Sequence, residues 1–266
     1  MQALKELLQK LANAAGYEVV RRFQYVPWKR RAETVAELEA MYRQFVFPGL
    51  PSCNGRMGLI ARLEGTQCGE AIYLIEALHR SLRLEGDVCE FGVAQGATSA
   101  LVANEIRPTD KKLWLFDSFQ GLPRPGEKDV LIHDIFNLGS MEKYQGAMSY
   151  GQDQVIGRLR EIEFPLSQVN IVPGFIEKTI QGPALPRRVC FAYVDFDFYQ
   201  PIKTALEFLD GTVPPGGQVV VDDYGWFSAG AQAAVDEFIG SRGGRWELKL
   251  PLALAGHFAV LARGGA

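Results

Sequence analysis

From residue 86 onward the sequence alternates short apolar runs of strand length with segments of helical periodicity. This alternation is typical of βαβ units, in which helices connect the parallel strands of one sheet. The runs that alternate with helices are predicted strands at 87–93, 112–117, 169–174, 189–197 and 217–223. Two further runs, 245–252 and 256–263, are near enough in sequence to form a terminal antiparallel pair. We therefore expect an α/β fold with a seven-stranded, mostly parallel sheet.

Residues 1–80 have a different pattern, helical in parts and irregular elsewhere. An apolar stripe at helical spacing is formed by Leu4, Leu7, Leu8 and Leu11. Thr34 and Glu37 have the spacing of a capping box that would begin a further helix. We therefore predict an N-terminal helical extension or lid over residues 1–80 and a catalytic core over residues 81–266.

The overall composition favours a small-molecule partner. The chain has 266 residues, of which 47% are hydrophobic and 22% charged, as in ordinary globular proteins. A net charge of −3 and a pI near 5.7 argue against nucleic acid as a partner. The basic and aromatic stretch 19–31 fits a solvated basic face over packed rings better than a surface for membrane or nucleic acid.

Cysteine usage and the N-terminus indicate a cytoplasmic protein. Cys53, Cys68, Cys89 and Cys190 are scattered without a C-x-x-C pair, which predicts neither a zinc site nor a disulfide framework. The first residues lack the apolar block and cleavage site of a signal peptide, and no run is long enough to span a bilayer. The helical stripes of the extension need a partner surface, so we expect a homodimer or higher homo-oligomer.

A glycine-containing turn follows the first predicted strand. Glu90 ends that strand, and Gly92 and Gly96 lead into the next helix. Glycines let the backbone approach a ligand closely, but the spacing is G-x-x-x-G and not the G-x-G-x-x-G of dinucleotide sites. Asp117 stands at the end of the second strand, where an acid can accept both ribose hydroxyls of an adenosyl group, or can cap the turn that begins at Ser118.

Aspartates at two later strand ends are the most informative feature. Asp195 ends the fourth strand, and Asp222 and Asp223 end the fifth. Neighbouring parallel strands end side by side, so these carboxylates can converge on one point, where a cation would relieve their repulsion. Oxygen ligands favour Mg²⁺, with Ca²⁺ or Mn²⁺ as substitutes. Asp197 is interpreted as a helix N-cap or structural residue, with a metal contact as the alternative.

These segments together resemble the macrocin O-methyltransferase (TylF-type) family. The resemblance covers roughly residues 50 to 240 and rests on EFGVAQGATS, FDSFQGLP, VPGFIEKTI, YVDFDFY and PPGGQVVVDDYG, followed by AAVDEF. It implies a class I, S-adenosylmethionine (SAM)-dependent core whose last strand is antiparallel, and a divalent metal held by aspartates. The implied reaction is Mg²⁺-dependent methyl transfer to a hydroxyl of a small natural-product or sugar-type acceptor. Phe196 replaces a glycine of the family pattern, which bears on the choice of acceptor.

The resemblance also implies roles for individual residues. The metal ligands would be Asp195, Asp222 and Asp223. The methionine end of SAM would lie among Glu90, Gly92, Ala94, Thr98 and Ser99. The ribose and adenine would lie near Asp117, Ser118, Gly174 and Phe175.

Two catalytic bases are candidates for removing the proton of the acceptor. Asp195 is one, although a carboxylate that binds a metal is a poor base. His133 is the other, because it lies in the long connection 121–151, which we expect to form a lid over the acceptor. His79 and His257 are interpreted as structural.

Two other functions stay open on the sequence alone. A nicotinamide-dependent oxidoreductase also has a strand, a turn and an acid in this order, although the G-x-G-x-x-G turn is missing. A non-catalytic SAM-binding or assembly protein could use the N-terminal helices for association.

Overall fold

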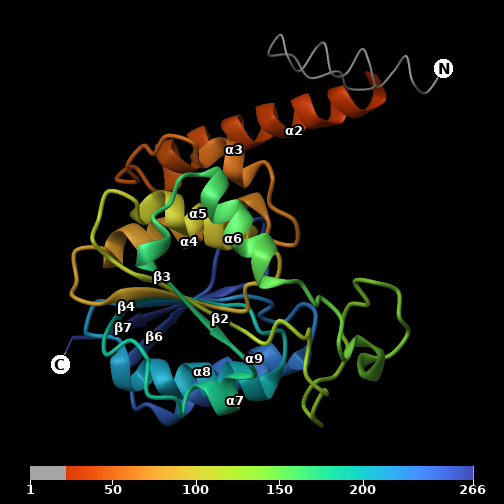
Figure 1. The fold of residues 1–266 in the computed structure, drawn as a ribbon, viewed down its shortest axis with the longest axis vertical. Coiled ribbons are helices and arrows are strands. Elements are labelled where there is room, and N and C mark those ends of the chain that lie inside the picture. The colour runs from red at the N-terminus through yellow and green to blue at the C-terminus, as the bar shows by residue number, and fades with distance from the viewer. Residues whose placement is uncertain (1–21, 266) are drawn as a thin grey trace.

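A seven-stranded sheet forms the centre of the computed structural model, which describes residues 22–265 (Figure 1). Its strands are β1 Asp87–Phe91, β2 Leu113–Asp117, β3 Val169–Pro173, β4 Val189–Val194, β5 Gln218–Val221, β6 Trp246–Lys249 and β7 Ala259–Arg263. Their order is β3-β2-β1-β4-β5-β7-β6, and β7 is antiparallel to both of its neighbours. The predicted fold class is therefore confirmed, including the terminal antiparallel pair.

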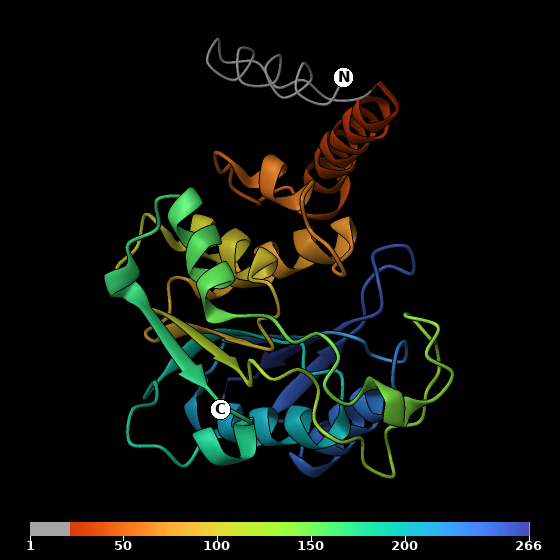
Figure 2. The same cartoon turned by 45° about the vertical axis from the view of Figure 1, so that its right-hand side comes forward.

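Helices cover both faces of this sheet (Figures 1 and 2). One layer contains α4 Cys68–Ser81, α5 Ala97–Ile106 and α6 Gln152–Glu161. The opposite layer contains α7 Ile176–Thr179, α8 Tyr199–Thr212 and α9 Ala229–Ser241. Because both faces are covered, the central strand β4 is buried along its whole length, which explains why its sequence is a continuous apolar run. Helix α4 lies inside the predicted extension 1–80, yet it packs on β4 and β5 as part of the core.

Three elements precede α4 in the extension, and the first of them projects from the core at its N-terminal end (Figure 2). They are α2 Arg22–Met41, the π-helical turn η1 Tyr42–Val46 and α3 Arg56–Ile60. Helix α2 runs through most of the basic stretch 19–31, so Thr34 and Glu37 lie inside it and the predicted capping box does not begin a helix. The predicted leucine stripe of residues 4–11 lies outside the described residues.

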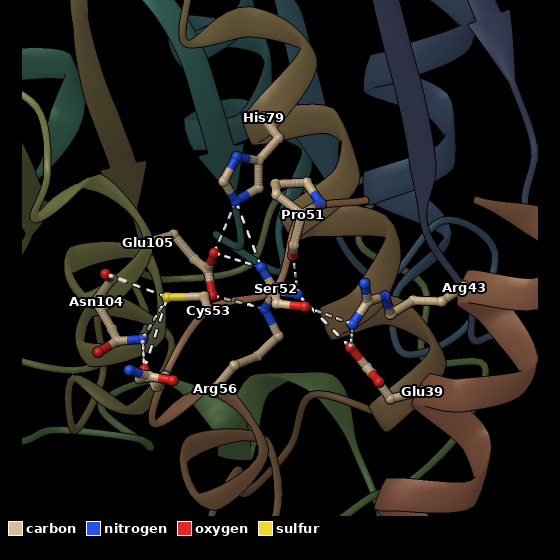
Figure 3. Close-up of polar contacts among 10 residues, drawn as sticks. Glu39, Arg43, Pro51, Ser52, Cys53, Arg56, His79, Asn104 and Glu105 are labelled. Atoms are coloured by element: carbon tan, nitrogen blue, oxygen red, sulfur yellow. Dashed lines mark hydrogen bonds and ion pairs between the residues drawn. The ribbon is translucent and has the colours of Figure 1, made fainter. Parts of the chain in front are cut away.

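A polar cluster fastens the extension to the α4–α5 layer (Figure 3). The Arg56 side chain is 1% exposed, and its guanidinium donates two hydrogen bonds to Glu105 on α5, at 2.8 and 2.6 Å. A third bond from Arg56 reaches the carbonyl oxygen of Pro51 at 2.7 Å. On α4, His79 Nε2 lies 2.7 Å from Glu105, as expected for a structural histidine. Burial acts to raise the pKa of Glu105, but the hydrogen bonds and charge of Arg56 and His79 lower it overall.

Two further expectations from the sequence concern disulfide bonds and membrane-spanning segments. All four cysteines are free thiols in the structure. Among the described residues, every helix is too short or too polar to cross a membrane. Assembly into a homo-oligomer stays a prediction.

Replacing Glu105 by Ala should destabilise the fold strongly, because it leaves the Arg56 guanidinium buried without its partner. Breaking one side of a buried pair costs about 3–5 kcal/mol. The control is Glu85→Ala, which removes an exposed pair with Arg188 and should cost under about 1 kcal/mol. Urea unfolding of both variants measures the difference. Equal losses in the two variants would show that the Arg56 cluster does not hold the extension in place.

Candidate active site

A cavity of about 420 Å³ opens at the carboxyl ends of the strands. It lies where the strand order reverses between β1 and β4, which is where open α/β sheets bind ligands. The residues that follow the strands contribute Gly92, Ala94, Asp117, Ser118, Gly174, Phe175, Asp195, Asp197, Asp222 and Asp223. The opposite wall comes from residues 64–67, the segment 121–150, Trp226 and His257.

The turn after β1 needs glycine for a steric reason. Gly92 has a φ of +88°, and a Cβ placed there would lie 1.8 Å from the carbonyl oxygen of Asp195. Any side chain would therefore push β1 away from the end of β4. Ala94 also has a positive φ, of +46°, and Gly96 caps α5 in the left-handed region. The turn thus brings the backbone of Gly92 and Ala94 to the cavity wall.

Glu90 lies behind this wall and is fully buried. Its two carboxylate oxygens accept hydrogen bonds from the hydroxyls of Thr98 and Ser99, in the first turn of α5. Burial raises its pKa to about 7, although the two hydroxyls oppose the rise. Glu90, Thr98 and Ser99 are absent from the cavity lining among the described residues, so they support the turn from behind.

Asp117 holds the same turn from the neighbouring strand. One of its oxygens accepts hydrogen bonds from the backbone N–H groups of Val93 and Ala94, at 2.8 and 3.1 Å. The other accepts from Phe119 at 2.7 Å, which is the turn-capping alternative that the sequence left open. The Ser118 hydroxyl closes that turn by donating to the carbonyl of Gly121. Asp117 nevertheless lines the cavity and keeps lone pairs for a further donor.

Three aspartates converge at the ends of β4 and β5. One carboxylate oxygen each from Asp195, Asp197 and Asp223 lies within 4.8 Å of the others. Asp197 and Asp223 adopt left-handed backbone conformations, with φ of +62° and +58°. Aspartate tolerates this region better than most residues, and the bend aims both side chains into the cluster. Asp197 is not a helix N-cap, because α8 begins at Tyr199 and its cap residue is Phe198.

Asp222 points to a different set of partners. It accepts hydrogen bonds from the Tyr193 hydroxyl at 2.8 Å and from the backbone N–H of Asp223 at 2.7 Å. The same hydroxyl lies 3.0 Å from Glu70, a buried acid on α4. Among the described residues Asp222 thus lies outside the three-carboxylate cluster, although the sequence spacing placed it there.

Burial and mutual repulsion raise the pKa values of these acids. The pKa values of Glu70, Asp195, Asp197 and Asp223 are all well above the ordinary range, with burial as the main cause and neighbouring carboxylates as the next. The pKa of Asp222 is also raised by burial, while hydrogen bonds and the charge of His257 oppose the rise. The site therefore needs protons or a cation to hold its carboxylates together.

The connection after β2 forms one side of the cavity mouth. Asp129 anchors it, because its carboxylate accepts from the backbone of Gly126 and Tyr199, each at 2.7 Å, and from the Ser228 hydroxyl at 3.3 Å. His133 is exposed and stacks on Trp226, with 3.9 Å between ring centroids. His257 stacks with Trp226 at 4.1 Å. Of the two histidines, only His257 lines the cavity.

Comparison with known proteins decides the family. The family model of macrocin O-methyltransferase (TylF) matches residues 72–252. The chain belongs to this family. It is therefore an O-methyltransferase, as its sequence resemblance indicated, and the oxidoreductase and non-catalytic alternatives find no support.

Individual relatives agree with this assignment. A 4'-O-methyltransferase of 8-demethyl-8-(2,3-dimethoxy-alpha-L-rhamnosyl)-tetracenomycin-C from Streptomyces olivaceus is 27% identical over 201 residues, which are 70% of this chain and 73% of that protein. Demethyldecarbamoylnovobiocin O-methyltransferase from Streptomyces niveus is 29% identical over 157 residues, which are 58% of each chain. Among solved structures, the O-methyltransferase NovP covers 88% of this chain and all of its own, with a TM-score of 0.66 and 20% identity. This TylF-family member thus shares the class I methyltransferase fold.

Some cavity residues of this methyltransferase could not be found from sequence patterns. His257 was interpreted as part of an apolar strand, but it precedes β7 and faces the cavity. Trp226 and residues 64–67 belong to no motif that points to a ligand. Glu70 did leave a signal, since it is the one acid among the buried, mostly apolar residues of α4.

Replacing Glu90 by Gln should stabilise the protein at alkaline pH. Because the pKa of Glu90 rises from 4.5 to about 7 on folding, the folded state keeps a proton that the unfolded chain loses, and stability falls as pH rises through this window. At about 1.4 kcal/mol per pH unit, the cost approaches ~3 kcal/mol at about pH 8.

Urea unfolding at about pH 4 and about pH 8 measures this effect, with the exposed Glu207→Gln as control. We expect Glu90→Gln to gain stability over the wild type at the higher pH alone. A glutamine variant that is less stable at both pH values would show that Thr98 and Ser99 favour the charged carboxylate.

Proposed function

We propose that the chain transfers a methyl group from SAM to a hydroxyl of a small natural-product or sugar-type acceptor, with Mg²⁺ as the required cation. The observation that carries this proposal is the cluster of Asp195, Asp197 and Asp223 beside the glycine turn, in a member of an O-methyltransferase family. Both features line one cavity.

The cavity residues fit SAM at the β1 and β2 ends. The backbone of Gly92 and Ala94 is exposed to the cavity, and Asp117 offers a carboxylate beside them. Gly174 and Phe175 extend this wall past β3. Glu90, Thr98 and Ser99 support the site indirectly, because the hydroxyls fix the start of α5 against the turn. The sulfonium charge of SAM would also be favoured by the surrounding acids.

The donor set also fits a hard divalent cation. Carboxylate oxygens are the ligands that Mg²⁺ prefers, with Ca²⁺ or Mn²⁺ as substitutes. In this structure the ligands would be Asp195, Asp197 and Asp223, which share two members with the set predicted from sequence. Asp222 would act on the cluster through its hydrogen bond to the backbone of Asp223. When bound, the cation would lower the pKa of an acceptor hydroxyl and hold neighbouring hydroxyls in place.

The acceptor side of the cavity is apolar, which favours an uncharged acceptor. The side chains there include Leu122, Pro123, Ile135, Phe136 and Met148. Eight of the described lining residues are Asp or Glu, and none is Lys or Arg. An anionic acceptor would meet repulsion without a compensating cation from these side chains. One Streptomyces relative is named for a rhamnosylated tetracenomycin and the other for a novobiocin precursor, which supports a natural-product or sugar-type acceptor.

The chain's own residues would mainly align the two substrates. The acceptor oxygen must approach the methyl carbon in line with the breaking carbon–sulfur bond, and placing both in one enclosed cavity supplies much of the rate. The segment 121–151, anchored by Asp129, lines the mouth and would exclude water from it once substrates are bound. A base on the cavity wall takes the hydroxyl proton.

The direct test is methyl transfer with the purified protein, SAM and Mg²⁺. The probes are para-nitrophenyl α-L-rhamnoside, which has vicinal hydroxyls and an apolar aglycone, and para-nitrocatechol, which has vicinal hydroxyls without a sugar. We expect mass spectrometry to show a gain of one methylene on the rhamnoside, together with S-adenosylhomocysteine. SAM that binds without transfer to either diol would oppose the proposed acceptor class, and failure to bind SAM would oppose the cofactor.

The metal requirement has its own test. EDTA should abolish methyl transfer while calorimetry shows SAM affinity nearly unchanged, and added Mg²⁺ should restore the activity. Asp197→Asn removes a proposed ligand, whereas Asp222→Asn removes a carboxylate that bonds Tyr193, so the first should weaken Mg²⁺ binding more. If Asp222→Asn weakened Mg²⁺ binding more than Asp197→Asn, Asp222 would belong to the ligand set. Full turnover of protein shown to be metal-free by elemental analysis would exclude the metal.

A further inference from the structure

We propose that His257 is the catalytic base, and that its imidazole takes the proton of the acceptor hydroxyl. The inference rests on the proposed methyl transfer and assigns its proton acceptor to a residue that no motif of the sequence marks. Three observations carry it: the loop that places the side chain, the free nitrogens of its ring, and the poor placement of the other candidate bases.

The loop before β7 is built to hold His257 at the cavity. Its neighbours Ala255 and Phe258 are fully buried, at 0% and 1% exposure, while His257 itself is exposed to the mouth. A Cβ on Gly69 would lie 2.6 Å from the backbone of Ala255, so the loop can reach the start of α4 only because residue 69 is glycine. Gly256, with a φ of +140°, turns the chain beside Glu70.

The ring of His257 is held by stacking and not by hydrogen bonds. It lies 4.1 Å from the Trp226 ring at an interplanar angle of 18°. Trp226 is in turn fixed to the metal cluster, because its backbone N–H donates to the carbonyl of Asp223 at 3.1 Å. In the described part of the chain, no side-chain hydrogen bond involves either nitrogen of His257. A nitrogen in the cavity is therefore available to a hydroxyl of the acceptor.

The other candidate bases are less well placed. Asp195 belongs to the carboxylate cluster, and a carboxylate that neutralises a cation has little basicity left. His133 stacks on Trp226 as well, but it does not line the cavity. His79 is engaged with Glu105 on the far side of α4 from the cavity lining. His257 alone among these histidines faces the space that the acceptor would fill.

The step balances without a further reactant. The O–H bond of the acceptor breaks, and its proton moves to a neutral nitrogen of His257. An electron pair of the acceptor oxygen forms the new bond to the methyl carbon of SAM. The carbon–sulfur bond breaks, and its electron pair stays on sulfur, which becomes the neutral thioether of S-adenosylhomocysteine. The imidazolium then returns the proton to solvent through the cavity mouth.

The test combines substitution with chemical rescue, on full-length protein with SAM, Mg²⁺ and para-nitrophenyl α-L-rhamnoside. His257→Phe keeps a ring to stack on Trp226 but cannot accept a proton, and His257→Ala leaves space for free imidazole. Loss of a general base lowers the rate by about 10²–10⁴-fold. We expect such a loss of kcat in both variants, and recovery of His257→Ala, but not of His257→Phe, on addition of imidazole.

Binding measurements separate this role from a structural one. Calorimetry should show that SAM affinity, and rhamnoside affinity for the S-adenosylhomocysteine complex, change by less than about threefold in His257→Phe, since general-base catalysis acts on the transition state. The control on the same loop is Leu254→Ala, whose side chain is 97% exposed and outside the cavity lining; its kcat should match the wild type.

Two results would overturn the assignment. One is a kcat of His257→Phe or His257→Ala equal to the wild-type value. The other is a loss that imidazole does not restore while SAM affinity falls in parallel, which would make the residue structural. If His257→Phe does not fold, His257→Asn takes its place with the same expectation. A wild-type protein that methylates neither diol would instead count against the proposed function.

Discussion

Repulsion among carboxylates is the constraint on which the rest of this structure depends. Glu70, Asp195, Asp197, Asp222 and Asp223 meet at the ends of β4 and β5, where burial raises their pKa values and, for all but Asp222, neighbouring carboxylates add to the rise. Such a group is tolerated only when protons, donors or a cation compensate it. Among the described residues the fold supplies few donors: the Tyr193 hydroxyl, which lies nearest Asp222 and Glu70 and 3.5 Å from Asp195, and the backbone N–H of Asp223, which donates to Asp222. Under the proposed function a divalent ion would compensate the remaining charge.

The same region couples the two substrate sites through the backbone. The close approach of Gly92 to the carbonyl of Asp195 joins the turn that would hold SAM to the first residue of the three-carboxylate cluster. Asp117 ties that turn to β2 by accepting from Val93 and Ala94. A shift of either site would therefore move the other, which suits a reaction that needs both reactants aligned to a fraction of an ångström. The bent conformations of Asp197 and Asp223 are part of this alignment.

Sequence reasoning succeeded where the signal was periodic or local. The five parallel strands could be predicted because they are short apolar runs between helical segments, and the two antiparallel strands because their apolar runs follow each other closely at the end of the chain. Convergence of Asp195 and Asp223 followed from their positions at neighbouring strand ends. Asp197 was interpreted as a helix cap or structural residue, but the cap of α8 is Phe198, and at Asp197 the chain turns into the left-handed region. A turn of that kind cannot be deduced from residue spacing.

The tertiary structure explains two other places where the sequence predictions differ from the structure. His257 approaches the cavity only because the loop before β7 packs on Gly69, about 190 residues earlier in the chain, and no local pattern contains that contact. The predicted capping box at Thr34 and Glu37 failed for the opposite reason. The local signal was present, but α2 continues through it and packs its C-terminal half on the core.

The buried acids of this protein differ in which groups compensate their charge. This difference distinguishes the acids that stabilise the fold from those that form the candidate site. Glu105 is paired with a buried guanidinium, and Asp129 accepts the backbone N–H of Tyr199 at the start of α8, where the helix dipole favours negative charge. Glu90 is satisfied by two hydroxyls. Each of these acids has its partners within the fold and serves to fix two elements together. The acids of the cluster, in contrast, have mainly one another, so the free energy that their assembly costs is recovered only when a ligand binds. Under the proposed function such a site would bind a cation because the folded chain has already brought the carboxylates together.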